Sequence, residues 1–232
     1  IDVEPGDFYA ASPLQRIFVL LAGPLVNFLF AVIVMAAIAI VGFSVQTFPN
    51  RIVLAADYGI QGTAAEAAGL RTGDYILAID DETVRSFRDI QTHIGQAARE
   101  ELSLQLRRDG EIFKTRLVPE LDTATGAGRI GVYPWVDPVI EEVVPDSPAH
   151  LAGIRPGDTI VEVDGTSVFH SIDVETLVSR SGATVRLTLN REGENIVTTV
   201  VPDYDDQGAP LGIRYATILV DSPRYGLFSG LV

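Results

Sequence analysis

The side chains that most often bind metals or attack substrates are scarce in this 232-residue chain, which has three histidines and no cysteine. The histidines are His93, His150 and His170, and none has a second histidine four residues away, the spacing that puts two ligands on one helix face. The absence of cysteine excludes disulfides, thiolate metal sites and a cysteine nucleophile. We therefore predict ordinary surface histidines, and neither a catalytic residue nor a metal ligand in these residues.

One glycine-rich stretch, Gly126-Ala-Gly128-Arg-Ile-Gly131, has the spacing of a dinucleotide-binding loop. Such a loop follows a strand and opens a helix. Here Pro134 and Pro138 follow, and no helical periodicity is visible. We therefore interpret the stretch as a linker between domains.

Composition favours folded domains that stay away from polyanions. Hydrophobic residues make up 47% of the chain, enough to fill cores, and the formal net charge is -14. That charge repels nucleic acid and anionic lipid head groups. The chain starts at Ile1 and its only methionine is Met35, so we expect it to be a segment of a longer protein.

An uncharged run from Ile17 to Asn50 contains the almost wholly apolar segment 17–43. At about 1.5 Å per residue this segment can cross a hydrocarbon core of roughly 30 Å, and it is longer than the apolar region of a signal peptide. We predict a juxtamembrane segment over 1–16 and a transmembrane helix over 17–43. Arg16, at the N-terminal edge, places the rest of the chain outside the cytoplasm by the positive-inside rule.

Gly23, Pro24 and Asn27 interrupt this apolar helix. Pro24 leaves the Leu20 carbonyl without its helical partner, and Gly23 and Asn27 lie on one face. Small residues let helices approach closely, and an amide in lipid seeks a hydrogen bond, so we predict that this face packs against other membrane helices. The alternative is that Gly-Pro merely kinks a lone anchor.

The rest of the chain is an internal duplication of a whole domain. The stretch from Thr63 to Ile76 is matched by the stretch from Ser147 to Ile160. Each copy begins with a capped helix of a turn or two, followed by an apolar strand, a second helix, and a hairpin whose residues alternate in polarity. We predict an α+β chain of one transmembrane helix followed by two small, partly open β-barrels with two helices each, over 44–125 and 126–205.

Two stretches resemble the signature of bacterial PDZ domains, namely Ala68-Gly69-Leu70-Arg71-x-Gly73-Asp74-x-Ile76 and Ala152-Gly153-Ile154-Arg155-Pro156-Gly157-Asp158-x-Ile160. Upstream, a further motif is similar to the helix that precedes the PDZ pair in RseP-type bacterial site-2 proteases, namely Phe8-Tyr9-x-x-Ser12-Pro13-x-x-Arg16 leading into Ala22-Gly23-Pro24-x-x-Asn27-Phe28. Within 206–232, Tyr225-Gly226-Leu227-Phe228 resembles the run-up to the next membrane segment. The resemblance covers nearly the whole chain.

The resemblance implies a multi-pass zinc metalloprotease of the inner membrane that cuts a transmembrane substrate, such as an anti-sigma factor, after another protease has trimmed it. The zinc site of that family needs a His-Glu-x-x-His helix and a later Asp, which are not in these residues, so zinc is expected only in the full-length protein. The PDZ pair would lie in the periplasm and filter substrates by size or by sensing a new C-terminus. The implied partners are the membrane, the transmembrane substrate and other helices of the same protein, with no nucleic acid.

PDZ domains bind an extended peptide beside their second helix, and the backbone N–H groups of an apolar-Gly-apolar loop receive its terminal carboxylate. Ile130, Gly131 and Val132 are the candidate loop, which we assign to the second copy. The alternative is an edge strand with a glycine bulge. The comparable loop of the first copy, Val41-Gly42-Phe43, lies where the chain leaves the membrane, which puts peptide binding by that copy in doubt.

Two other functions compete with this hypothesis. A non-catalytic, membrane-anchored PDZ scaffold that binds peptide C-termini is disfavoured by the Gly23-Pro24-Asn27 face. A soluble HtrA-like serine protease with PDZ domains conflicts with the membrane helix immediately before the pair. A His-Glu-x-x-His helix encoded upstream would favour the protease.

Overall fold

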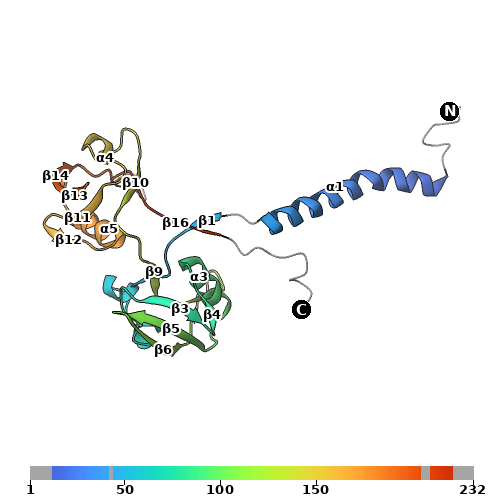
Figure 1. The fold of residues 1–232 in the computed structure, drawn as a ribbon, viewed down its shortest axis with the longest axis horizontal. Helices are drawn as coiled ribbons and strands as arrows, with labels where there is room; N and C mark the ends of the chain where they lie inside the picture. Colours follow the sequence, from blue (N-terminus) through green and yellow to red (C-terminus); the bar gives the residue numbers. More distant parts are fainter. Residues whose placement is uncertain (1–11, 42–43, 205–209, 222–232) are drawn as a thin grey trace. The chain divides into compact units, whose positions relative to one another are not determined.

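The structure is a computed structural model that describes residues 12–41, 44–204 and 210–221 (Figure 1). Three of the stretches discussed above fall partly or wholly outside the described residues: Phe8-Tyr9, Gly42-Phe43 and Tyr225–Phe228. The chain divides into two compact units, one formed by residues 1–45 with 221–232 and the other by residues 46–220.

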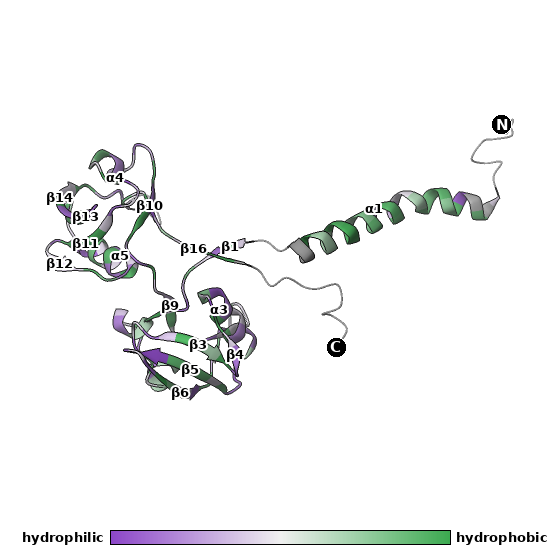
Figure 2. Cartoon of the chain, viewed as in Figure 1, coloured by the Kyte–Doolittle hydropathy of each residue, from purple (hydrophilic) through white to green (hydrophobic). Residues whose placement is uncertain are grey.

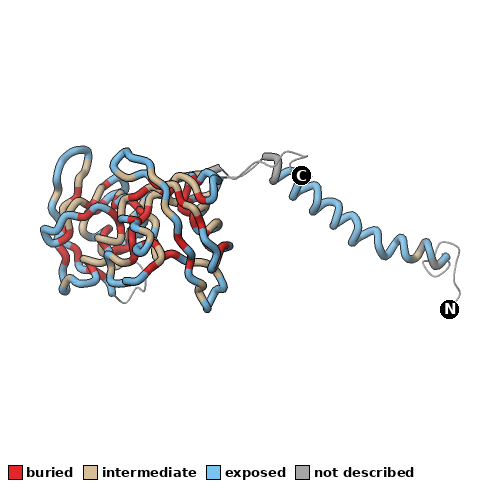
Figure 3. Tube along the Cα trace, turned by 90° about the horizontal axis from the view of Figure 1, so that it is seen from below, coloured by how far each residue is buried: buried red, intermediate tan, exposed pale blue. Residues whose placement is uncertain are grey.

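One long helix, α1 (Pro13–Val41), contains residues 17–41 of the predicted transmembrane segment 17–43. The stretch Arg16–Ile38 is long and apolar enough to cross a bilayer, and none of its most hydrophobic window is buried. Figure 2 shows hydrophobic residues along almost the whole helix, and Figure 3 shows that the helix is exposed. An uncovered helix of this composition is suited to lipid rather than to water.

The first copy, which we define as residues 46–135, contains a four-stranded sheet in the order β4-β3-β5-β6 and the pairs β2–β9 and β7–β8. Its strands are β2 (Ile52–Leu54), β3 (Tyr75–Ile79), β4 (Glu82–Thr83), β5 (Leu102–Arg108), β6 (Glu111–Leu117), β7 (Glu120–Leu121), β8 (Gly128–Arg129) and β9 (Val132–Pro134). Its helices are the 3₁₀ turn η1 (Ala55–Tyr58), α2 (Ala64–Ala67) and α3 (Phe87–Gln96). Strand β1 (Ser44–Thr47) pairs with β16 (Ile218–Asp221).

The second copy, residues 136–220, repeats this plan with a sheet in the order β12-β11-β13-β14 and the pair β10–β15. Its strands are β10 (Ile140–Val143), β11 (Thr159–Val163), β12 (Thr166–Ser167), β13 (Val185–Arg191), β14 (Glu194–Val200) and β15 (Ile213–Tyr215), and its helices are α4 (Pro148–Leu151) and α5 (Ser171–Arg180). The α+β class, the paired helices and the duplicated sheet all agree with the prediction.

The alternating residues of the hairpins fill the two cores. Leu104 and Leu106 of β5 are fully buried, as are Leu187 and Leu189 of β13, while the intervening side chains are more exposed. Such alternation puts one face of each sheet on the core. Even the irregularity in β3 between Ile76 and Ala78 recurs in β11.

The structural boundary between the copies differs from the expected one at residue 126. Ile130 is buried in the first core and Val132 packs against it, because β9 pairs with β2. At the other end, Leu211 and Tyr215 pack with the second core, beyond the expected end at residue 205. The last strand of each copy, β9 or β15, lies beyond a loop and pairs with an early strand of the same copy. The local repeat pattern does not show this pairing.

Candidate peptide-binding grooves

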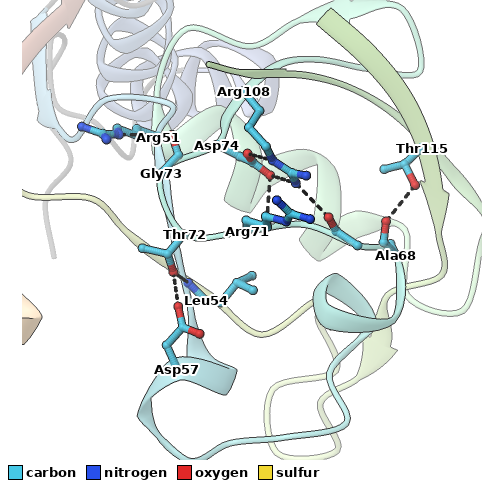
Figure 4. A network of polar contacts seen from close by, with 11 residues as sticks. Arg51, Leu54, Asp57, Ala68, Arg71, Thr72, Gly73, Asp74, Arg108 and Thr115 are labelled. Atoms are coloured by element: carbon cyan, nitrogen blue, oxygen red, sulfur yellow. Dashed lines mark hydrogen bonds and ion pairs between the residues drawn. The ribbon is translucent and has the colours of Figure 1, made fainter. Parts of the chain in front are cut away.

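The Gly-Asp turn of each PDZ-like signature forms a buried clamp between an aspartate and an arginine. In the first copy, Asp74 is 1% exposed, and both its carboxylate oxygens accept hydrogen bonds at 2.7 Å from Nε and Nη2 of Arg108 (Figure 4). Arg108 also donates to the carbonyl of Gly69 at 2.8 Å. This bidentate arrangement ties the end of α2 to the turn and to β5.

The second copy repeats the clamp almost atom for atom. Arg191 donates to the two oxygens of Asp158 at 2.7 and 2.8 Å and to the carbonyl of Gly153 at 2.9 Å. The hydrogen bonds from Arg191 hold the pKa of Asp158 below its ordinary value. The signature therefore marks a stabilising element of the fold rather than a site of chemistry.

A groove of about 550 Å³ lies in the first copy between α3 and the strand that begins at Val132. Its apolar wall comes from Phe87, Ile90 and Ile94 on α3 and from Ile130. Among the described residues, β9 pairs on only one edge, with β2. An extended peptide can therefore add to β9 beside α3, as peptides do in β-augmentation.

The candidate loop Ile130-Gly131-Val132 lines this groove. Its carbonyls hold the neighbouring elements, because Ala65 N donates to Ile130 O at 2.9 Å and Ala55 N to Gly131 O at 3.0 Å. Gly131 has a φ of +81°, and a Cβ there would overlap the side chain of Thr63. Glycine is required at this position by both conformation and space.

The placement of this loop corrects our assignment of it to the second copy. Ile130 belongs to the first core, so the loop serves the groove of the first copy. Our other assignment, Val41-Gly42-Phe43 for the first copy, has Gly42 and Phe43 outside the described residues.

Sequence reasoning missed the corresponding loop of the second copy, Leu211-Gly212-Ile213. Its contacts are the same: Ala149 N donates to Leu211 O at 2.9 Å, and Val144 N donates to Gly212 O at 2.9 Å. Gly212 has a φ of +67°, and a Cβ there would overlap Ser147. The apolar-Gly-apolar pattern was a signal that could have revealed it.

The groove beside this second loop is much smaller, with a volume of about 40 Å³. It is lined by Val174, Glu175 and Val178 of α5 and by Tyr215 of β15. Counting from the loop glycines, Tyr215 stands where the first copy has Pro134. Burial raises the pKa of Tyr215, and its side chain lines the smaller groove where the first copy has a proline.

The described part of the chain bears on two predictions, that the chain has no metal ligand and no dinucleotide-binding loop. No group of three His, Cys, Asp or Glu residues there could hold a metal ion, so these residues do not fit a zinc site. The stretch from Gly126 to Gly131 opens no helix. It is also not the interdomain linker that we expected, because β8 pairs with β7 and Ile130 is buried in the core of the first copy.

One histidine differs from the prediction of surface histidines. The side chains of His93 and His150 are 28% and 56% exposed, whereas His170 is 3% exposed. His170 is buried because it faces aromatic residues of the first copy, Tyr58 and Trp135, which a local sequence pattern cannot show.

The membrane-helix residues Gly23, Pro24 and Asn27 all lie in α1 and are exposed. A Cβ added at Gly23 would meet nothing within 4 Å. No other described segment covers this face, so its packing against membrane helices stays a prediction.

Comparisons with known proteins agree with the duplication and with the membrane-protease resemblance. A family model for the PDZ domain matches residues 57–108 and 139–191. A putative zinc metalloprotease of Treponema pallidum is 35% identical, with the match covering 100% of this chain and 52% of that protein. A putative zinc metalloprotease of Borreliella burgdorferi is 26% identical, with the match covering 93% of this chain and 47% of that protein.

The regulator of sigma-E protease RseP of Escherichia coli is 30% identical, and the match covers 82% of this chain and 43% of that protein. The chain spans about half the length of the curated relatives it matches. It therefore carries two PDZ domains and is homologous, over most of its length, to RseP and to putative zinc metalloproteases.

Proposed function

We propose that this chain is the substrate-gating PDZ section of an intramembrane zinc metalloprotease that performs regulated intramembrane proteolysis. The observation that carries the proposal is the open apolar groove of the first copy, with its glycine loop at Gly131, in a chain that also has an uncovered apolar helix. Homology to zinc metalloproteases supplies the enzyme class. The zinc and its ligands belong to the rest of the full-length protein.

The first groove gates by binding an extended peptide end. The peptide pairs with β9, its last apolar side chain enters the space between Ile90 and Ile94, and backbone N–H groups of the loop at residues 130–132 receive its carboxylate. A trimmed membrane protein such as an anti-sigma factor offers such an end, whereas an untrimmed one does not. The folded pair also excludes bulky substrates by size.

The apolar helix α1 anchors this gate beside the active site. Gly23, Pro24 and Asn27 then pack against other membrane helices of the same protein, because small residues and a buried amide favour helix–helix contact in lipid. The protein is multi-pass in the inner membrane, and the PDZ pair faces the periplasm. Its substrate is a transmembrane protein, and nucleic acid is not a partner.

The gate is tested by replacing residues 46–220 of the full-length protein with a flexible linker. We expect the shortened enzyme to cleave an untrimmed membrane substrate that the intact enzyme leaves uncut. Cleavage of the trimmed substrate, measured in parallel, is the control for an intact active site. If the untrimmed substrate stays uncut while the trimmed one is cleaved, the gating proposal is wrong.

A further inference from the structure

The second helix of each copy starts differently, although the helices are equivalent. Ser86 caps α3: its Oγ accepts from Asp89 N at 3.3 Å, and the Asp89 carboxylate accepts from Ser86 N at 3.0 Å. His170 occupies the same position before α5, and its side chain makes no cap hydrogen bond. The second copy has given up a capping interaction for an imidazole that points elsewhere.

The imidazole of His170 is buried against the first copy. It packs edge-on to Trp135, with ring centroids 4.7 Å apart, and lies 6.0 Å from the ring of Tyr58. Arg51 covers Trp135 at 3.4 Å from the ring centroid. Tyr58, Trp135 and Arg51 belong to the first copy, so a residue of the second copy fills a pocket that the first copy builds.

A short chain of polar contacts fixes the proton on this ring. Tyr58 Oη donates to Asp173 Oδ1 at 2.5 Å and lies 3.3 Å from His170 Nε2. Because the tyrosine hydroxyl donates its hydrogen bond to Asp173, the tyrosine oxygen can accept a hydrogen bond from the Nε2–H of His170. The contacts therefore place a proton on Nε2, which also lies 3.7 Å from Asp173 Oδ2, and in the neutral ring Nδ1 carries none. Within the described residues, the buried Nδ1 has no hydrogen-bond partner.

Protonating Nδ1 would bury a cation and an N–H group that lacks an acceptor. The charged groups around the ring have opposite effects on its protonation. Asp173 and Asp57 favour the imidazolium, while Arg51 opposes it. Asp137, also nearby in the chain, accepts from Trp135 Nε1 at 2.8 Å. Burial is the largest influence and lowers the pKa of His170.

We propose that Tyr58, His170 and Asp173 form a pH-sensitive latch that holds the two PDZ copies together while His170 is neutral and releases them when His170 takes up a proton. In the released form, the pKa of His170 is near its ordinary value of 6.5. In the latched form, burial holds this pKa lower. Latching is therefore complete above about pH 6.5 and is lost as the pH falls below it.

The latch also connects to the first groove. Tyr58 is followed by Ile60 and Thr63, which line one side of that groove, and Trp135 follows Tyr133 and Pro134 on the other side. Release of the latch thus removes a contact that adjoins both walls. By linkage, a peptide that fits only the latched groove must also favour the neutral histidine.

The chain supplies its own probes for a test. Trp135 is the only tryptophan, so its emission reports on the junction directly. The chain has no cysteine, so cysteines placed at the exposed hairpin residues Glu111 and Glu194 accept a pair of dyes whose energy transfer reports the distance between the copies. The full chain is titrated in neutral detergent micelles from about pH 8 to about pH 5.

We expect the Trp135 emission to shift to the red and the energy transfer to change together, with one midpoint below pH 6.5. His170→Gln should abolish this midpoint, because glutamine can donate to Tyr58 but does not titrate. Tyr58→Phe should move the midpoint upward, because Asp173 no longer accepts from Tyr58 and is freed to stabilise the imidazolium. His93→Gln and His150→Gln are matched controls that should leave the midpoint in place.

Three results would overturn the latch. One is a wild-type chain that shows no transition in this range. Another is a transition that survives in a folded His170→Gln chain, which would point to a carboxyl such as Glu175, whose pKa is raised by desolvation. If His170→Gln fails to fold, as judged by circular dichroism, Tyr58→Phe decides, and an unmoved midpoint rejects the proposal.

Discussion

The two PDZ copies share their framework and differ in what they expose. Both hold a buried aspartate with a bidentate arginine, Asp74 with Arg108 and Asp158 with Arg191, and both place a positive-φ glycine beside the second helix. The first copy keeps a groove of about 550 Å³, while Tyr215 and its neighbours reduce the second groove to about 40 Å³. The two copies therefore share the contacts that stabilise the fold and differ in the size of the groove.

The largest effect should come from breaking the shared clamp. Asp74→Ala or Asp158→Ala leaves a partly buried arginine without its partner, so each should lower the free energy of unfolding of its own copy by about 3 kcal/mol. Urea denaturation of the full chain in micelles, followed by circular dichroism, measures this loss. Glu100→Ala removes an exposed carboxylate as a control and should change stability by less than about 0.5 kcal/mol. Clearly unequal losses in the two copies would contradict a common framework.

The loop glycines should separate framework from function. Gly131→Ala and Gly212→Ala force a Cβ into a left-handed conformation and into a neighbouring side chain, so each should cost about 2 kcal/mol. Only Gly131→Ala should also weaken binding of a peptide with a free carboxylate, measured by fluorescence anisotropy on chains that remain folded. Equal weakening by Gly212→Ala would mean that the second groove binds peptide too.

A smaller effect is expected at the helix caps. Ser86→Ala removes a capping box and should destabilise the first copy by about 1 kcal/mol. Asp89→Asn should lose part of the same stabilisation, because its carboxylate accepts from the N–H groups of Arg85 and Ser86. Hydrogen exchange in α3 measures both losses. Unchanged protection in Ser86→Ala would show that the cap contributes nothing here.

The clamp of the second copy should also make stability depend on pH in acid. The hydrogen bonds from Arg191 lower the pKa of Asp158. The ionised Asp158 therefore stabilises the second copy fully at a pH above the ordinary pKa of aspartate. This stabilisation is lost as the pH falls through the lowered pKa of Asp158. Arg191→Met should therefore destabilise the second copy at neutral pH and lose this effect in acid. A stability difference that stays constant from neutral pH into acid would contradict this origin of the shift.

The sequence predicted what depends on local pattern. The alternation at Leu102, Leu104 and Leu106, the caps at Thr63 and Ser147 and the apolar helix all appear in the structure as expected. The ownership of the loop at Gly131 was not predictable in this way, because β9 pairs with a strand about eighty residues earlier in the chain. His170 was misjudged for the same reason, since its burial depends on Tyr58 and Trp135 in the other copy.

The difference between the grooves is tested most directly by blocking each one. Gln91 of α3 and Glu175 of α5 line the first and second groove at equivalent positions, so Gln91→Trp and Glu175→Trp form a matched pair. The probe is a fluorescent peptide that ends in valine, with a free carboxylate or with an amide. We expect the carboxylate form to bind the full chain more tightly than the amide form, and only Gln91→Trp to weaken this binding, by about tenfold or more. Equal binding of both peptides, or a loss caused by Glu175→Trp alone, would contradict this expectation.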